Sequence, residues 1–257
     1  MNILLRIITI IVFLVISHHV HAENSFVQVV AKNKLSVVGV GIHTPTSRPQ
    51  NTLRGTGFVI GNGQYIVTNA HVLPNEFDQR LRQQMAVFIG TGKQAGVRKA
   101  QVVSTSARYD LAILKISGSP LPAMTLASDK FYPDGSGIAF TGFPIGTVLG
   151  LYPVTHRGII ASLSPRVVPV ASVEQLSIKM LKSMRDPYLV YQLDATAYPG
   201  NSGSAMYDMK TGKVVAIINK VFVQGTKESV ISNPSGITYA IPVRYLRKIL
   251  TDNKIDF

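Results

Sequence analysis

Short runs of apolar, β-branched residues recur along most of this chain, separated by clusters of glycine, proline and asparagine. Examples are LSVVGVGI, GVRKAQVV and KVVAIINKVFV. Such runs suit the half-buried surface of a pleated strand, and the residues between them are those that form turns. With 257 residues and a hydrophobic fraction of 46%, the chain is long and apolar enough to bury a sizeable core. The pattern therefore predicts an all-β protein built from many short strands.

Turn signals divide these runs into individual predicted strands. The sequence GNG separates apolar runs at residues 55–60 and 65–69 and is typical of a tight β-hairpin. Residues 117–130 combine serine, glycine and proline with little periodicity, and we interpret them as a linker. The length then suits two six-stranded antiparallel β-barrels that share one cleft. The N-terminal barrel is predicted within residues 23–120 and the C-terminal barrel within residues 121–257.

Two segments depart from the strand pattern and predict helices. Residues 172–184 lack glycine and proline, and their apolar residues recur at near-helical spacing, which indicates a short helical insertion. Pro242 is placed to begin a C-terminal helix that runs to Thr251, because proline is well tolerated in the first helical turn. The residues expected to face inward on this helix are Leu246, Ile249 and Leu250. Residues 23–34 are interpreted as a mobile lead-in or a short helix.

The first 22 residues have the features of a cleaved signal peptide. Arg6 supplies a basic start, residues 7–16 are apolar apart from Thr9, and Val20-His21-Ala22 is a plausible cleavage site. An uncleaved membrane anchor is the alternative, but the apolar run is short for a bilayer span. The chain contains no cysteine, whereas secreted eukaryotic proteins of this size are commonly disulfide-bonded. Export without cysteine predicts a bacterial periplasmic or secreted protein.

The chain is strongly basic, with a formal net charge of +13. Removal of residues 1–22 would leave +12, because Arg6 is the one charged residue among them. A basic surface favours contact with anionic polymers and lipids, but the basic residues are scattered and do not interleave with aromatic residues as in a nucleic-acid module. We therefore expect no nucleic-acid partner and only a weak association with anionic envelope surfaces. The sequence also lacks the spacing of metal ligands, so no metal site is predicted.

Three short segments carry residues suited to nucleophilic catalysis. YIVTNAHV contains His71, YDLAIL contains Asp110, and PGNSGSAM contains Ser202. A hydroxyl is a weak nucleophile at neutral pH, so it needs an adjacent base, and the base needs a carboxylate that orients it. The order His, Asp, Ser is that of the chymotrypsin-type arrangement. The glycines beside Ser202 permit unusual backbone angles, so the N–H groups of Gly200 and Ser202 are predicted to form an oxyanion hole.

Rival residues exist for two of these roles. Asp129 and Asp134 are alternatives to Asp110, but both lie in loop sequence without a following core strand. Ser204 is the rival nucleophile, but it lies on the strand side of the turn and lacks the Pro-Gly-Asn lead-in. Asp110 and Ser202 are therefore preferred.

These segments resemble those of the trypsin-like serine proteases, and most of all the HtrA/Deg group of bacterial envelope proteases. The similarity also includes RGTGFVI before the histidine, and KVVAIIN and GITYAIP after the serine, so it spans roughly residues 55–242. The resemblance implies an exported serine endopeptidase with a chymotrypsin-like fold. It further implies that His71 is the base, Asp110 the orienting acid and Ser202 the nucleophile, with no metal or organic cofactor. Its partners would be proteins or peptides with unfolded or exposed segments.

Three features depart from that group. HtrA proteases normally carry PDZ domains after the position of Phe257, so regulation through such domains is not expected of this sequence. Ser204-Ala205 follows Ser202-Gly203 where the group has Gly-Pro. The predicted insertion at 172–184 lies where the group has a signal-sensing loop, and docking on the barrel is the favoured explanation of its amphipathic spacing.

The primary specificity pocket is predicted to be walled by residues on both sides of the nucleophile. Neither an Asp six residues before Ser202 nor a His on the later strand is present, so trypsin-like and glutamyl specificity are not expected. A small or medium aliphatic pocket remains, by resemblance to HtrA proteases. His43 and His156 receive no role. The predicted substrate-binding residues are Thr196, Ala197, Tyr198, Ile217, Ile218 and Asn219.

Other functions stay open on the sequence alone. One alternative is a catalytically silent or zymogen-like protein that acts as a binding or chaperone-like envelope protein. Another is a cationic wall- or lipid-associated adhesion protein, which only the net charge supports. The sequence makes no prediction of oligomeric state.

Overall fold

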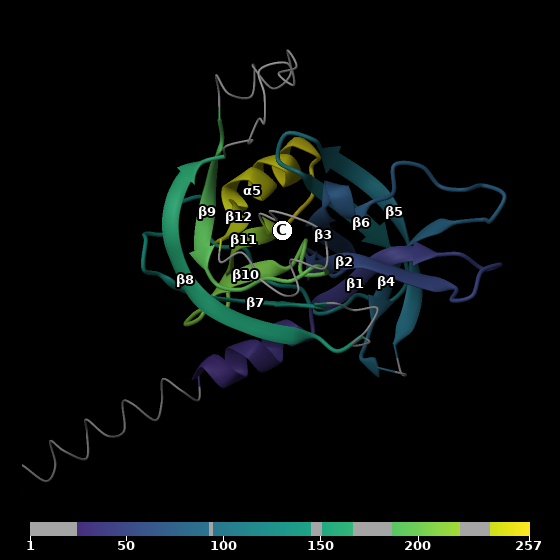
Figure 1. Cartoon of the computed structure of the whole chain (residues 1–257), viewed down its shortest axis with the longest axis horizontal. Helices are drawn as coiled ribbons and strands as arrows, with labels where there is room; N and C mark the ends of the chain where they lie inside the picture. The colour runs from purple at the N-terminus through teal and green to yellow at the C-terminus, as the bar shows by residue number, and fades with distance from the viewer. Residues whose placement is uncertain (1–24, 93–94, 145–150, 167–186, 222–236) are drawn as a thin grey trace, which may run out of the picture.

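The computed structural model describes residues 25–92, 95–144, 151–166, 187–221 and 237–257. The predicted signal peptide and the predicted helical insertion lie outside the described residues. Within them, twelve strands form two closed antiparallel barrels of six strands each, which lie side by side (Figure 1). The all-β, two-barrel fold expected from the sequence is therefore confirmed.

The first barrel has the strand order β1-β2-β3-β6-β5-β4. Its strands are β1 (Val37–His43), β2 (Asn51–Ile60), β3 (Tyr65–Asn69), β4 (Gln84–Ile89), β5 (Gly96–Ser106) and β6 (Leu111–Ile116). The predicted hairpin is confirmed by the pairing of β2 with β3, in which Ile60 lies opposite Tyr65. Gly61 and Gly63 in its turn have φ values of 60° and 85°, the left-handed region that glycine enters without steric cost.

The strands β2, β3 and β6 bury side chains on both of their faces. Val59, Ile66 and Leu114 fill the inside of the first barrel, whereas Phe58 and Val67 belong to the core of the second barrel. Alternate residues of a strand point to opposite faces, so a strand packed on both sides reads as a continuous apolar run. This is why YIVTN and LAILKI show little polar alternation, and it places these strands at the junction of the barrels.

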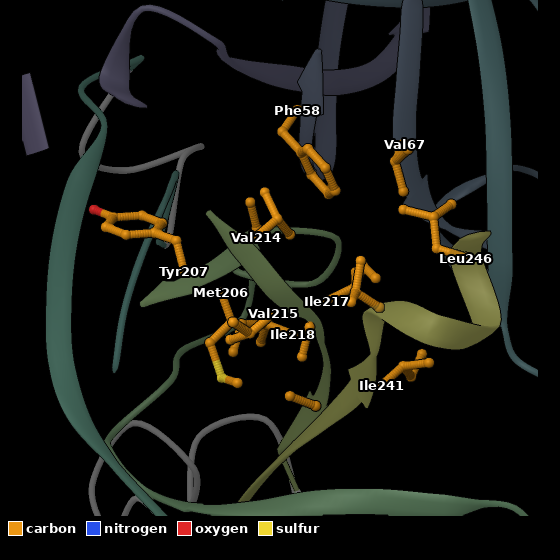
Figure 2. Packing of buried hydrophobic residues seen from close by; sticks show 14 of the residues in the cluster. Phe58, Val67, Met206, Tyr207, Val214, Val215, Ile217, Ile218, Ile241 and Leu246 are labelled. Carbon is orange, nitrogen blue, oxygen red and sulfur yellow. The ribbon is translucent and has the colours of Figure 1, made fainter. Parts of the chain in front are cut away.

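The second barrel has the strand order β10-β11-β12-β9-β8-β7. Its strands are β7 (Gly137–Gly142), β8 (Val154–Pro165), β9 (Leu189–Asp194), β10 (Ala205–Asp208), β11 (Val214–Val221) and β12 (Ile237–Pro242). Figure 2 shows Phe58 and Val67 of the first barrel facing the buried residues of β11, among them Ile217. One continuous apolar cluster therefore joins the two barrels and holds the loops at their junction.

Two helices flank the barrels in the described part of the chain. The helix α5 (Val243–Asp252) begins directly after Pro242 and packs on β11 and β12. Its inward residues are Leu246, Ile249 and Leu250, all buried, as predicted. Residues 25–34 are helical, and Asn33 Nδ2 donates a 3.0 Å hydrogen bond to the carbonyl oxygen of Gly212. No described helix is both long enough and apolar enough to cross a bilayer.

Candidate active site

His71 and Asp110 meet because two neighbouring strands of the first barrel run in opposite directions. His71 lies in the short helical turn η1 (Ala70–Val72), directly after β3, and Asp110 directly precedes β6. In the β3–β6 pair, Asn69 lies opposite Leu111. The end of one strand is thus beside the start of the other, and residues 39 positions apart in sequence become neighbours.

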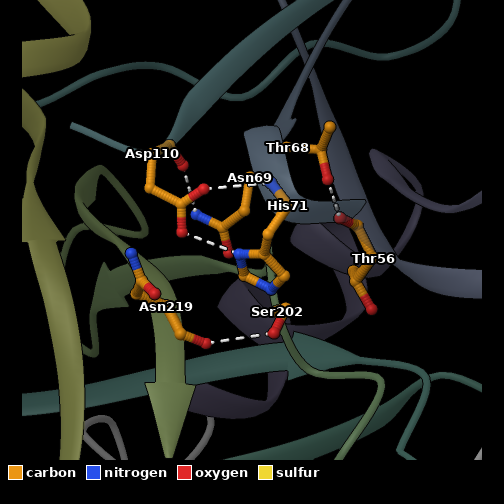
Figure 3. Close-up of polar contacts among 7 residues, drawn as sticks. All are labelled: Thr56, Thr68, Asn69, His71, Asp110, Ser202 and Asn219. Carbon is orange, nitrogen blue, oxygen red and sulfur yellow. Dashed lines mark hydrogen bonds and ion pairs between the residues drawn. The ribbon is translucent and has the colours of Figure 1, made fainter. Parts of the chain in front are cut away.

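Asp110 is held from both its backbone and its side chain. Its carbonyl oxygen accepts hydrogen bonds from Ala70 N at 3.1 Å and from Asn69 Nδ2 at 3.0 Å. Its carboxylate accepts one from the backbone N–H of His71 at 2.9 Å and another from His71 Nδ1 at 2.7 Å (Figure 3). The φ of Asp110 is +52°, a left-handed conformation that Asp and Asn tolerate better than most residues.

The carboxylate also selects the tautomer of the imidazole. An ionised carboxylate accepts hydrogen bonds and cannot donate them, so His71 Nδ1 carries the proton. The opposite ring nitrogen, Nε2, is then left with a free lone pair. Figure 3 shows the Ser202 side chain on the side of the His71 ring that faces away from Asp110. The ring is therefore oriented to act as a base toward that side.

Ser202 comes from the second barrel but is anchored to the first. The backbone N–H of Thr56, on β2, donates to the carbonyl oxygen of Ser202 at 2.9 Å. The Thr56 hydroxyl donates to the carbonyl oxygen of Gly200 at 2.7 Å. On the other side, Gly203 N donates to the Ile218 carbonyl at 2.9 Å. Hydrogen bonds to β2 and β11 thus hold the turn that carries Ser202, and they place it beside the His71–Asp110 pair.

The Ser202 hydroxyl does not donate to the imidazole in this structure. It donates instead to the main-chain carbonyl oxygen of Asn219 at 3.1 Å (Figure 3), and no described residue other than Asn219 pairs with it. The three side chains predicted from the sequence thus share one locality, but only His71 and Asp110 are bonded to each other. A bonded Ser–His pair would require the Ser202 hydroxyl to turn away from the Asn219 carbonyl.

Gly203 is required by the close approach of the two barrels. Its φ is +88°, and a Cβ built on it would clash with the carbonyl oxygen of Thr56 and with the Thr68 hydroxyl. We expect Gly203→Ala to lower the free energy of unfolding by about 3 kcal/mol, from backbone strain plus this clash. Gly135→Ala is the matched control, because Gly135 has a φ of +82° with no atom within 4 Å of such a Cβ. It should cost only about 1 kcal/mol. Chemical denaturation measures both, and equal losses would refute the clash.

The backbone around Ser202 leaves two donors available. Gly200 has a φ of +101°, and no described residue accepts a hydrogen bond from the N–H of Gly200 or of Ser202. Free N–H groups on the nucleophile itself and on the residue two positions before it can serve as the two donors that an oxyanion hole requires. Asn201, between them, is wholly buried, and its amide atoms have no partner among the described residues.

The rival residues are placed away from this chemistry. Ser204 is wholly buried, and its hydroxyl is enclosed without a described partner, so a substrate cannot reach it. Asp129 pairs with Arg247 Nε at 2.6 Å, and Asp134 is exposed in a loop. These placements favour Ser202 and Asp110 over their rivals.

The residues predicted to bind substrate are distributed over several environments. Thr196 is exposed and Tyr198 half-buried, while Ala197 and Asn219 are buried. Ile217 and Ile218 have no exposed surface and belong to the core cluster, so they support the site from beneath. Their part in a pocket stays a prediction.

Sequence reasoning missed an aromatic cluster beside Asp110. Tyr109 stacks on Tyr245 of α5, with ring centroids 4.6 Å apart, and meets the edge of Tyr188 at 5.1 Å. Burial raises the pKa of Tyr188 to about 12, so this phenol stays neutral across the physiological range. The cluster buttresses the residue before Asp110 with a helix 134 positions later in sequence. No local sequence pattern predicts this cluster. The one signal in the sequence is Tyr109, the aromatic residue directly before Asp110.

The described residues contain no group of three or more His, Cys, Asp or Glu side chains arranged to hold a metal ion.

A family model described as a trypsin-like peptidase domain matches residues 55–217. The chain is similar to a probable periplasmic serine endoprotease DegP-like of Halomonas elongata, with 28% identity over 190 residues that cover 74% of this chain and 32% of the relative. A protein of the same description from Chlamydia trachomatis is 26% identical over 214 residues, which cover 82% of this chain and 36% of the relative. The chain thus spans about a third of the length of these curated relatives.

Solved structures share the two-barrel fold. A serine endoprotease from Yersinia pestis aligns with a TM-score of 0.61 and 24% identity, covering 89% of this chain and 66% of that one. An HtrA-type protease AlgW with a tripeptide aligns with a TM-score of 0.65 and 24% identity, covering 89% of this chain and 63% of that one. At 24% identity, this structural similarity supports the fold alone.

Proposed function

This chain belongs to the trypsin-like peptidase family, and on that premise we propose that it is an exported serine endopeptidase. His71 is the general base, Asp110 orients it, and Ser202 is the nucleophile. The observation that carries the proposal is the 2.7 Å hydrogen bond from His71 Nδ1 to Asp110, which fixes the tautomer whose Nε2 can accept a proton.

The proposed reaction passes through an acyl-enzyme. As Ser202 Oγ attacks a peptide carbonyl carbon, His71 Nε2 takes the hydroxyl proton, and negative charge develops on the substrate oxygen. The N–H groups of Gly200 and Ser202 stabilise that oxygen, with each donor worth about a hundred- to a thousandfold in rate. His71 then gives its proton to the departing amine. Water, activated by the same imidazole, hydrolyses the ester that remains on Ser202.

The free protein would have to rearrange before this reaction begins. The Ser202 hydroxyl donates to the Asn219 carbonyl at 3.1 Å, and it must turn toward His71 Nε2 to become a nucleophile. This observation favours a second candidate function, a zymogen-like or catalytically silent protein that binds polypeptides without cleaving them. The first function remains the better supported, because the two free N–H groups and the oriented imidazole serve no evident purpose in a simple binding protein.

The names of the relatives support a proposed substrate class and location. The curated relatives are named periplasmic serine endoproteases, and one HtrA-type structure is described with a decapeptide. We propose that this protein acts in the periplasm or outside the cell, on unfolded or exposed segments of other proteins. The predicted signal peptide at residues 1–22 is in accord with such export.

A fluorophosphonate probe tests the proposed function without any substitution. Such a probe reacts with a serine that an adjacent base has activated, and mass spectrometry of the digested protein identifies the modified residue. We expect modification of Ser202, none of Ser204, and protection by an excess of an unfolded protein substrate. The contrary result has two parts. The probe leaves Ser202 unmodified at neutral and mildly alkaline pH, and the protein binds an unfolded substrate without cleaving it. That result would favour the catalytically silent binding protein instead.

A further inference from the structure

His156, to which the sequence analysis gave no role, lies against the segment that leads to the nucleophile. It is on β8, directly opposite Phe140 of β7. The two rings stack, with centroids 5.1 Å apart and an interplanar angle of 23°. On its other side, the imidazole meets the ring of Tyr198 at a centroid distance of 5.9 Å and an angle of 44°. The ring of His156 is thus an aromatic spacer between the barrel wall and the nucleophile segment.

The surroundings of the imidazole suit its neutral form. Phe140 is wholly buried, and the His156 Nε2 atom is enclosed with no hydrogen-bond partner among the described residues. Burial lowers the pKa of His156 below its usual value. The unfolded chain therefore takes up this proton at a higher pH than the folded chain does. The fold consequently loses stability as the pH falls from the usual histidine range through the lowered pKa.

Among the described residues, the elements packed against His156 carry few ionisable groups. On its own strand, Arg157 is exposed and, by strand alternation, lies on the opposite face. The facing strand β7 has the sequence GIAFTG, which contains no ionisable residue. The neighbouring strand β10 contributes the Tyr207 phenol, which pairs with the Thr141 hydroxyl at 2.9 Å. The nucleophile segment carries Tyr198 itself and, at the end of β9, the exposed Asp194.

Tyr198 links this packing to the proposed oxyanion hole. Its carbonyl oxygen accepts a 3.0 Å hydrogen bond from Asn201 N, which closes the tight turn containing Gly200. Gly158, two residues beyond His156 on the same face of β8, is so close to Ala195 that a Cβ there would lie 2.6 Å from the Ala195 side chain. The segment that leads to the nucleophile therefore packs on β8 at two points, where Ala195 meets Gly158 and where Tyr198 meets His156. A shift of the His156 ring would move Tyr198 and the N–H groups that follow it.

We propose that His156 is a positioning residue whose neutral ring holds Tyr198 and the nucleophile turn in place, and that its protonation releases this packing and lowers catalysis. The proposal rests on the proposed function, because the turn matters only if Ser202 is the nucleophile. It is a positioning role and not a catalytic one, because the enclosed Nε2 cannot reach a substrate. Protonation places a charge between two aromatic rings in a half-buried site, where no described acidic side chain pairs with it.

The pH dependence of kcat/KM tests the proposal. An uncharged peptide amide substrate is assayed from about pH 8 to about pH 4.5, and activity is re-measured at neutral pH to verify that the enzyme survives. A mechanism that needs one deprotonated base, as every variant here does, loses kcat/KM about tenfold per pH unit on its acid side. With His156 also required neutral, the wild type should reach about a hundredfold per pH unit. His156→Phe and His156→Gln should both return to about tenfold, because neither side chain titrates in this range.

His43→Gln is the matched control. His43 lies on β1 and pairs with the Asn51 side chain at 2.8 Å, so its loss should leave the steep acid limb of the wild type unchanged. A wild-type limb of only tenfold per pH unit overturns the proposal. So does a steep limb that persists in both His156 variants.

A second measurement decides the matter even if the protein proves catalytically silent. In the Ser202→Ala protein, NMR follows the imidazole resonances of His156 and the ring resonances of Tyr198 during acid titration. We expect the two sets to shift with one midpoint, and the Tyr198 shift to vanish in His156→Gln. Tyr198 resonances that ignore the titration of His156 refute the positioning role. An absence of probe labelling on Ser202 refutes the proposed function separately.

Discussion

Ser202→Ala is expected to lower kcat for peptide hydrolysis by about a millionfold, the scale seen when a triad nucleophile is removed. The alanine keeps the backbone of the turn and its hydrogen bonds to Thr56 but has no oxygen with which to form an acyl-enzyme. The side-chain bond lost is the one to the Asn219 carbonyl. Stopped-time assays on an unfolded protein substrate measure the loss, and thermal unfolding checks that the fold is retained.

Ser204→Ala is the control for that variant. Its hydroxyl lies two residues away and is wholly buried, without a described partner. Removing it deletes no bond on which the mechanism depends, so kcat should change by less than about tenfold. A large loss of activity in Ser204→Ala, together with retained activity in Ser202→Ala, would show that Ser204 is the nucleophile. That result would overturn the proposed mechanism.

Asp110→Asn should reduce kcat/KM by about ten thousandfold at neutral pH. The fold should survive, because asparagine is similar in shape and tolerates the +52° φ as well as aspartate does. An amide NH₂ facing His71 Nδ1 would force the imidazole proton onto Nε2, where it blocks uptake of the proton from Ser202. The variant keeps a correctly placed nucleophile whose base is in the wrong tautomer.

Asp129→Asn provides the comparison for the acid. Asp129 is a mostly exposed carboxylate that pairs with Arg247, and exposed ion pairs contribute little to stability. Its activity should stay within about threefold of the wild type. Steady-state kinetics on one peptide substrate compare both variants, and an Asp110→Asn protein with near-normal kcat/KM would remove Asp110 from the mechanism.

Where a strand is buried, its residues could be predicted closely from the sequence. The predicted bounds of β3, residues 65–69, coincide with the structure, because apolar runs between turn residues reflect burial directly. The strand β2 begins earlier than predicted, at Asn51 instead of residue 55. Its first residues are exposed and polar but pair with β1, so their place in the barrel comes from a partner strand and leaves no hydrophobic signal.

The candidate site divides in a similar way. His71, Asp110 and Ser202 were found because each lies in a short segment whose residue types serve a local chemical need. Thr56, which anchors the nucleophile turn, and His156, which packs beneath it, look like ordinary strand residues in sequence. Their importance depends on contacts with segments far along the chain, namely Gly200 for Thr56 and Tyr198 for His156.

The order of residues along this chain by itself determined the all-β fold and the C-terminal helix, and it singled out the three candidate catalytic side chains. These follow from periodicity and local chemistry, which act over a few residues. Only the tertiary structure decided that the Ser202 hydroxyl donates to Asn219, that Ser204 is sealed off, and that an imidazole lies behind the nucleophile turn. Such features depend on how two closed barrels pack against each other, and that packing brings together residues that lie far apart in the sequence.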